Sequence, residues 1–146
     1  MRKYFFQVFL FFLFLFHNEI LANDSIHVHV TVVGFKNEKG TCRLLLFKEQ
    51  KGFPENPTYA ILALNSNINK DSTHFHFKVI PGVYAISILH DENTNGKIDK
   101  TWYGKPTEGF GVSNNPKIRR SIPAFKESRI NVDERNNSLL IRLNYL

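Results

Sequence analysis

The most regular feature of the chain is an alternation of apolar and polar residues that recurs in short segments. In residues 25–35, isoleucine and valines alternate with two histidines and a threonine, and residues 72–80 repeat the pattern with phenylalanines and a valine. Successive side chains of a strand point to opposite faces, so this period of two predicts strands that have one buried face. We therefore expect both segments to form half-buried strands.

Further apolar segments, bounded by turn residues, predict the rest of a β-fold. Residues 41–47 are apolar on both faces, which indicates a central strand, and Gly40 in the preceding turn can take a positive φ. We expect these residues to complete a β-hairpin over residues 25–48. The other strands are expected at 83–90, 128–134 and 138–146, the last two as a hairpin closed over 134–137.

Residues 51–64 break the alternation. Two prolines there exclude an internal strand, and Pro57 can begin a short helix. The chain has no long helical periodicity and no internal repeat. Short strands with frequent turns predict an all-β fold: a single antiparallel β-sandwich of about seven strands, with one loop of about 26 residues after His90. A loop of this length in a compact domain is typical of a functional segment.

The N-terminus has the organisation of a secretory signal peptide. Two basic residues precede an apolar run over residues 4–16, and Ala22 ends the segment with a small residue. The run is shorter than the roughly 20 apolar residues that span a membrane. We expect cleavage after Ala22, with an uncleaved anchor as the alternative. The chain then divides into a signal peptide, 1–22, and one domain, 23–146, which is periplasmic or secreted and has no membrane span.

Charge and cysteine content narrow the range of partners. The chain carries 19 Lys and Arg against 13 Asp and Glu, a net charge of +6, and the basic residues are scattered. Nucleic-acid-binding proteins cluster their basic residues, so we expect no nucleic-acid partner. An anionic polymer or lipid surface of the envelope suits the charge better, and simple solubility is the alternative. The single Cys42 cannot form an internal disulfide, and its apolar strand predicts a core position.

The loop after His90 carries the most specific motif of the chain. Its acidic, amide and glycine residues follow the spacing of an EF-hand-type calcium loop, in which alternating oxygen ligands converge on one hard cation and a glycine allows the sharp turn. Lys97 would contribute its backbone carbonyl. The candidate ligands of a calcium ion are Asp91, Asn93, Asn95, Lys97 and Asp99, arranged around Gly96.

The calcium motif is incomplete, because Trp102 occupies the position of its bidentate glutamate. Glu92 and Glu108 are alternative donors that could complete the shell. A structural interpretation is also open, because Asp and Asn side chains cap turns by accepting hydrogen bonds from backbone N–H groups. The motif therefore predicts either a cation site or a network of turn caps.

Aromatic residues and histidines provide further candidates. Trp102, Tyr103 and Phe110 form either an exposed surface that stacks on a sugar ring or a peptide, or a plug over the end of the sandwich. The histidine pairs at 27/29 and 74/76 each share one strand face. That face is a polar solvent face or, if the two strands pair in register, a place where four imidazoles bind a transition metal.

Longer motifs connect the chain to a known family. Residues 81–115 combine a Pro-Gly-x-Tyr-Ala strand, the motif His-Asp-x-Asn-x-Asn-Gly-Lys-x-Asp and the run Gly-x-Pro-x-Glu-Gly-x-Gly-x-Ser-Asn-Asn. With Gly-Phe-Pro-Glu-Asn-Pro at 52–57, these motifs resemble the bacterial family called domain of unknown function 2141, over nearly all of residues 25–144. The chain departs from the family at Thr94, where glycine is frequent, and at Val112, where an aromatic residue is usual.

The resemblance implies a secreted or periplasmic β-sandwich with transthyretin-like, Greek-key architecture, and no established activity. We expect a non-enzymatic binding or structural module of the cell envelope, with residues 90–116 as a recognition loop for an envelope protein, a peptide or a polysaccharide. The alternative is an envelope hydrolase or transferase that uses His90, Asp91 and Glu108, although no nucleophile motif accompanies them. The candidate binding residues are His90, Trp102, Tyr103, Glu108, Phe110 and Asn114.

Overall fold

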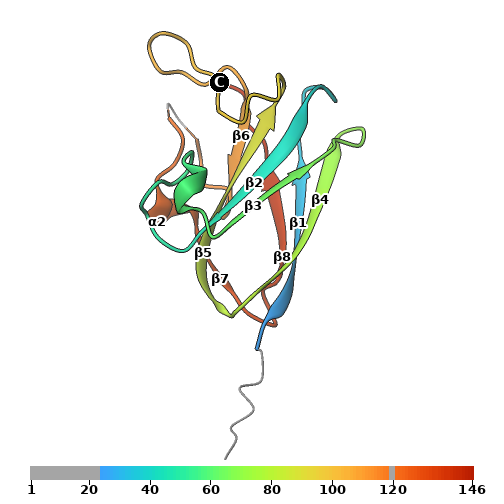
Figure 1. The fold of residues 1–146 in the computed structure, drawn as a ribbon, viewed down its shortest axis with the longest axis vertical. Coiled ribbons are helices and arrows are strands. Elements are labelled where there is room, and N and C mark those ends of the chain that lie inside the picture. The colour runs from blue at the N-terminus through green and yellow to red at the C-terminus, as the bar shows by residue number, and fades with distance from the viewer. Residues whose placement is uncertain (1–23, 119–120) are drawn as a thin grey trace, which may run out of the picture.

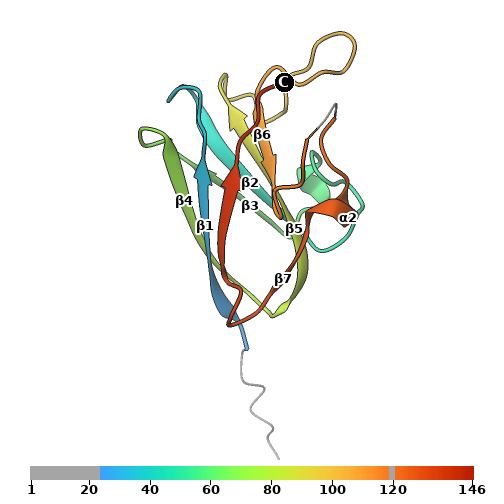
Figure 2. The same ribbon diagram turned by 180° about the vertical axis from the view of Figure 1, so that it is seen from behind.

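The computed structural model describes residues 24–118 and 121–146, so the expected signal peptide, residues 1–22, lies outside the described residues. Two β-sheets face each other, as Figures 1 and 2 show from opposite sides. The strands are β1 (Ile26–Val33), β2 (Thr41–Phe47), β3 (Leu62–Ser66), β4 (Ser72–Val79), β5 (Gly82–Asp91), β6 (Gly109–Val112), β7 (Arg129–Val132) and β8 (Ser138–Arg142). Two short helical elements accompany them, the 3-10 turn η2 (Pro57–Tyr59) and α2 (Phe125–Ser128).

A three-stranded sheet has the order β4-β1-β8, and a five-stranded sheet has the order β3-β2-β5-β6. In the five-stranded sheet β7 pairs with β5 over Gly82–Ala85, and β6 pairs with β5 over Ser87–His90, so the two short strands share one edge of β5. The all-β fold and the β-sandwich are thus confirmed. One pairing departs from the expected antiparallel arrangement, because β1 and β8 run parallel.

Both expected hairpins are wrong. β1 pairs with β4 and β8, whereas β2 pairs with β3 and β5 in the opposite sheet. Likewise β7 joins the five-stranded sheet and β8 joins the three-stranded sheet. In a sandwich, a turn can carry the chain from one sheet to the other, so neighbouring strands face each other across the core. Two strands were not expected. β3 lies at an edge of its sheet, where nearby prolines are tolerated. β6 lies within the expected loop of residues 90–116, so the loop is shorter than predicted and ends where β6 pairs with β5.

The core lies between the two sheets and is built from the apolar positions of the alternating pattern. Cys42 is part of this core, and burial raises the pKa of its thiol to about 12. No helix in the described part of the chain is long and apolar enough to cross a membrane. The fully or nearly fully buried members include Val28, Val30, Val32, Leu44, Leu46, Phe75, Tyr84, Ile86, Ile88 and Ile141.

The five-stranded sheet is buried on its outer face as well. There Phe47 of β2 packs edge-to-face on Phe53, with ring centroids 5.3 Å apart, and Phe53 packs in the same way on Phe125 of α2, at 5.6 Å. The segments that contain η2 and α2 lie beside this face in Figure 1. The prediction that residues 41–47 form a central strand, apolar on both faces, is therefore confirmed. Strand β5, which ends where the long loop begins, is part of the same sheet.

Candidate functional site

The long loop joins the end of β5 at Asp91 to the start of β6 at Gly109 and projects beyond the end of the sandwich (Figure 1, upper left). Its outer part is a small turn, in which the Thr101 N–H donates to the Lys105 carbonyl at 2.8 Å and the Gly104 N–H donates to the Thr101 carbonyl at 2.9 Å. The loop is therefore an extension with its own internal hydrogen bonds.

The carboxylate of Asp91 holds the first turn of the loop. Asp91 is only 3% exposed, and its Oδ1 accepts from the Asn95 N–H at 3.0 Å while its Oδ2 accepts from the Gly96 N–H at 2.7 Å. Gly96 has a φ of +75°, and a Cβ there would lie 2.8 Å from Nη1 of Arg43. The same Nη1 donates to the Gly96 carbonyl at 2.6 Å. The positive φ favours glycine here, and any side chain at this position would also have to displace the end of the Arg43 side chain.

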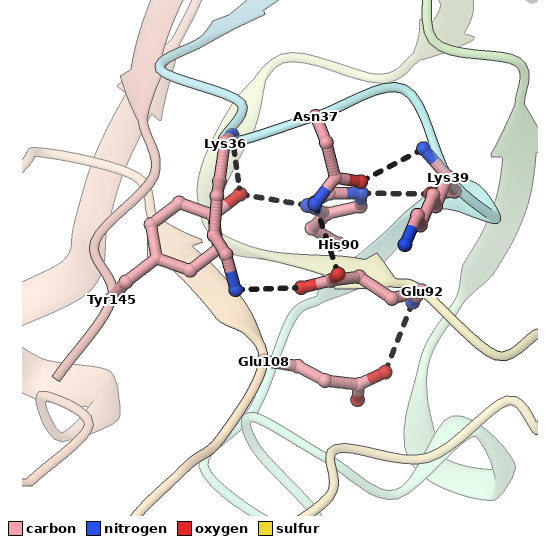
Figure 3. A network of polar contacts seen from close by, with 7 residues as sticks. All are labelled: Lys36, Asn37, Lys39, His90, Glu92, Glu108 and Tyr145. Carbon is pink, nitrogen blue, oxygen red and sulfur yellow. Dashed lines mark hydrogen bonds and ion pairs between the residues drawn. The ribbon is translucent and has the colours of Figure 1, made fainter.

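The carboxylate of Glu108 holds the base of the loop. Glu108 is 5% exposed, and its Oε1 accepts from the Glu92 N–H at 3.0 Å while its Oε2 accepts from the Asp99 N–H at 3.0 Å. The bond to Glu92 is drawn in Figure 3. Glu108 thus joins the two sides of the loop just before the chain enters β6. A buried carboxylate is stable only when its oxygens have hydrogen-bond donors, and each oxygen here has one.

Three of the proposed calcium ligands converge. The Nδ2 of Asn93 donates to one oxygen of Asp99 at 2.6 Å, and the Nδ2 of Asn95 donates to the other at 3.0 Å. The amide oxygens of Asn93 and Asn95 accept from backbone N–H groups. Lys97 is one of these donors, through its N–H to Asn95. Within residues 24–118 and 121–146, no group of three or more His, Cys, Asp or Glu side chains is placed to hold a metal ion.

The exposed tip of the loop carries two aromatic rings. Trp102 is 95% exposed and Tyr103 is 61% exposed, and their rings form an edge-to-face pair with centroids 5.2 Å apart. The other candidate binding residues lie elsewhere. Phe110 is buried in β6, which contradicts its place in an exposed surface, and Asn114 follows the far end of β6, where its Nδ2 donates to the Glu127 carbonyl at 2.8 Å.

His90 is fully buried beside the C-terminal segment, as Figure 3 shows. Its Nε2 lies 2.8 Å from the Lys39 carbonyl, which can only accept, so this nitrogen carries the proton. Its Nδ1 lies 2.7 Å from the hydroxyl of Tyr145, which itself accepts from the Lys36 N–H at 3.0 Å. Both ring nitrogens of His90 are therefore occupied by protein groups.

Glu92 is the carboxylate of this network that has a perturbed pKa. The Nδ2 of Asn37 donates to its Oε2 at 3.0 Å, and the ammonium of Lys36 lies 3.7 Å from its Oε1. The hydrogen bond from Asn37 and, to a lesser degree, the neighbouring positive charges lower the pKa of Glu92, and partial burial opposes them. The ionised carboxylate therefore ties the turn after β1 to the start of the loop (Figure 3).

The space under the loop is small. A cavity of about 30 Å³ lies between the outer face of the five-stranded sheet and the loop, lined among others by Arg43, Ile98 and Phe110. A cavity of this size holds one or two water molecules, whereas pockets for small organic ligands measure roughly 300 Å³ or more. The space under the loop is therefore too small for an organic ligand.

Several structural residues of the site were not identified from the sequence. Ser113 accepts from the Ile86 N–H at 2.8 Å and donates to the Ser128 carbonyl at 2.5 Å. Asn115 donates to the Leu140 carbonyl at 2.6 Å and accepts from the Arg142 N–H at 2.9 Å. The Ser-Asn-Asn run thus fixes the end of β6 to its neighbours. Three consecutive polar residues after a strand were the signal that could have indicated this structural role. Nothing in the sequence near Tyr145 indicated its contact with His90.

The first prediction concerns the buried carboxylate of Glu108. In Glu108→Gln an amide NH₂ faces one of the two backbone N–H donors, so we expect the free energy of unfolding to fall by about 2 kcal/mol. Urea denaturation measures this. The matched control is Glu134→Gln at an exposed position, where we expect a change within about 0.5 kcal/mol. Equal effects of the two substitutions would contradict the bracing role of Glu108.

The second prediction concerns Thr94, whose φ is +59°. A β-branched residue is strained in this region, and glycine is not. We therefore expect Thr94→Gly to raise the free energy of unfolding by about 1 kcal/mol. Thr107→Gly serves as the control, because Thr107 is also exposed in the loop and is not among the residues with positive φ. There the same substitution should destabilise, by about 0.5 to 1 kcal/mol. If both substitutions destabilise, the strain at Thr94 is refuted.

The third prediction concerns pH. The pKa of Glu92 is lower in the folded protein than its ordinary value of 4.5. The ionised carboxylate therefore stabilises the fold above pH 4.5, and this contribution is lost as the pH falls through the folded pKa. In urea unfolding followed from about pH 7 to about pH 3, Glu92→Gln should lose less stability with acidification than the unmodified protein. Parallel pH profiles would exclude the stabilising interaction at Glu92.

Comparisons with known proteins give a family and nothing narrower. No curated protein and no solved structure matches the chain. The profile of a family described as "Uncharacterized protein conserved in bacteria (DUF2141)" matches residues 30–139. This span contains both buried carboxylates, the Asp/Asn motif and the two exposed aromatic residues of the loop. The expected resemblance is thus confirmed, and the chain belongs to the DUF2141 family of bacterial proteins.

Proposed function

We propose that the protein is a non-enzymatic binding module of the bacterial cell envelope, and that the tip of its long loop binds an anionic polysaccharide. One observation carries the proposal: Trp102, 95% exposed, and Tyr103, 61% exposed, stand together on a loop whose base is fixed by buried carboxylates. Tryptophan is normally among the more buried residues, so its near-complete exposure at a braced tip favours a binding role.

The chemistry of the tip suits a sugar ring with acidic substituents. The flat faces of aromatic rings pack against the C–H groups of a sugar, and the two rings at right angles offer both a face and an edge. Lys97 and Lys105 are exposed in the same loop, while Lys100 is paired with Glu55 at 2.6 Å. The ammonium groups of these two exposed lysines, on the same loop as the aromatic pair, add attraction for carboxylate or phosphate groups of an envelope polymer.

The surroundings of the titratable residues support binding over catalysis. Both nitrogens of His90 contact protein groups, and each carboxylate oxygen of Asp91 and Glu108 accepts a backbone N–H. A hydrolase or transferase would need at least one of these groups to face its substrate. The alternative enzymatic function therefore has less support than binding.

Two parts of the proposal rest on the sequence. Location in the periplasm or outside the cell follows from the signal peptide expected over residues 1–22. Calcium binding by Asp91, Asn93, Asn95, Lys97 and Asp99 stays a prediction. The hydrogen bonds described above give the acidic and amide side chains of this set partners without a cation. The proposed binding surface consists of Trp102 and Tyr103 whether or not the loop binds calcium.

The fourth prediction tests the aromatic tip. Trp102→Ala should weaken binding to purified anionic envelope polysaccharides by about fivefold to about 150-fold, because stacking of one aromatic ring contributes roughly 1 to 3 kcal/mol. Sedimentation with the insoluble polymer, or calorimetry with soluble fragments, measures the affinity. Tyr59→Ala is the matched control, since Tyr59 is an exposed aromatic residue outside the loop, and it should leave binding unchanged.

Two outcomes would contradict the proposal. Equal affinity of Trp102→Ala and the unmodified protein for every polysaccharide would remove the tip as the binding surface. Capture of an envelope protein that depends on Trp102, without polysaccharide binding, would preserve the tip but refute the proposed partner class.

A further inference from the structure

The exposed face of the three-stranded sheet carries histidines that the proposed function does not use. The register of β1 and β4 decides which of them meet, because residues directly opposite each other in an antiparallel pair have the closest side chains. The opposite pairs on this face are His27 with Lys78, His29 with His76 and Thr31 with His74. The sequence pattern alone allowed four imidazoles to meet, and the register brings two of them together.

His29 and His76 are both exposed, and their rings point at each other. Their Nδ1 atoms lie 2.6 Å apart, and their rings are edge-to-face, with centroids 4.7 Å apart and an angle of 77°. Two imidazole nitrogens at this distance share a single proton, with one nitrogen as donor and the other as acceptor. Each ring therefore directs a nitrogen lone pair or its proton toward one common point between the strands.

We propose that His29 and His76 form a two-histidine site for a divalent transition-metal cation. The cation takes the place of the shared proton between the two Nδ1 atoms, and that proton moves through solvent to the Nε2 of the donor ring, so that both rings stay neutral. Imidazole nitrogen lies about 2.0 to 2.1 Å from zinc, so two nitrogens on a tetrahedral ion are about 3.3 Å apart, and two adjacent nitrogens in a square plane about 2.9 Å apart. The Nδ1 atoms must separate by less than about 1 Å to reach either geometry. Small rotations of two exposed side chains accomplish this without movement of the strands.

The chemistry of this face selects the class of metal. Neutral imidazole suits Zn²⁺, Cu²⁺ and Ni²⁺, whereas Ca²⁺ and Mg²⁺ require several oxygen ligands. The neighbouring positions on this face hold Lys78, Thr31 and two further histidines, His27 and His74, and none of these is a carboxylate. By the general order of affinities, Cu²⁺ binds most tightly, and Zn²⁺ and Ni²⁺ bind more weakly. Water fills the remaining coordination positions on the exposed face.

The position of the pair gives the metal a structural consequence. β4 is an edge strand of the order β4-β1-β8, and it is held to the sandwich mainly through β1. A metal bound to one ligand from each strand crosslinks β4 to β1 only in the folded protein. Binding therefore raises the stability of the fold by mass action. This inference does not depend on the function proposed for the loop.

The test is a titration of the purified protein with Cu²⁺ and with Zn²⁺, followed by calorimetry. We expect one site per chain, lost or weakened at least tenfold in His29→Ala and in His76→Ala. His27→Ala is the matched control, because it removes a histidine from the same exposed face of β1 but not from the pair. The spectrum of bound Cu²⁺ in electron paramagnetic resonance should show coupling to two nitrogens in the unmodified protein and in His27→Ala.

A second measurement tests the crosslink. At a hundredfold excess of Zn²⁺ over its dissociation constant, the midpoint of thermal unfolding should rise by roughly 5 to 10 °C in the unmodified protein and in His27→Ala. It should not rise in His29→Ala. Unchanged binding in His29→Ala, an equal loss in His27→Ala, or absence of binding at millimolar Cu²⁺ would each overturn the site.

Discussion

The arrangement of the loop depends on two buried carboxylates that accept hydrogen bonds from backbone N–H groups. Asp91 ends β5 and holds the N–H groups of Asn95 and Gly96, while Glu108 precedes β6 and holds those of Glu92 and Asp99. A buried carboxylate without donors is very unfavourable, and so is a buried N–H without an acceptor. The fold satisfies both requirements at once, and the chain between the two carboxylates is thereby fixed at its base.

The anchoring of the loop also determines which aromatic residues are exposed. The inner face of the five-stranded sheet packs against the other sheet. On its outer face, Phe47 packs on Phe53, which in turn packs on Phe125, so these aromatic rings contact one another. Phe110, although it belongs to the conspicuous aromatic stretch of the sequence, is buried in β6. The loop projects beyond the end of the sandwich (Figure 1), and Trp102 and Tyr103 in its outer part are exposed. Their exposure is a consequence of how the loop is anchored.

Local patterns predicted the local structure well. The period of two located β1 and β4 and their buried faces, and the double apolar pattern identified β2 as central. The Asp/Asn motif left a cation site and a network of turn caps open, and the hydrogen bonds from the Asn95 and Gly96 N–H groups to Asp91 are of the turn-cap kind. Pairing was not predictable, because the partners of β1 are β4 and β8, which are distant in the sequence, and a turn alone does not reveal whether the chain changes sheet. The contact of His90 with Tyr145 was hidden for the same reason.

The carboxylates of Asp91 and Glu108 hold the loop without a cation. Amide hydrogen exchange, followed by NMR in the presence of a strong chelator and again with calcium, tests this role. We expect the N–H groups of Glu92, Asn95, Gly96 and Asp99 to exchange slowly in the chelator, and as slowly with calcium. Rapid exchange of these four groups in the chelator, with protection only after calcium is added, would contradict the account and establish a cation-ordered loop.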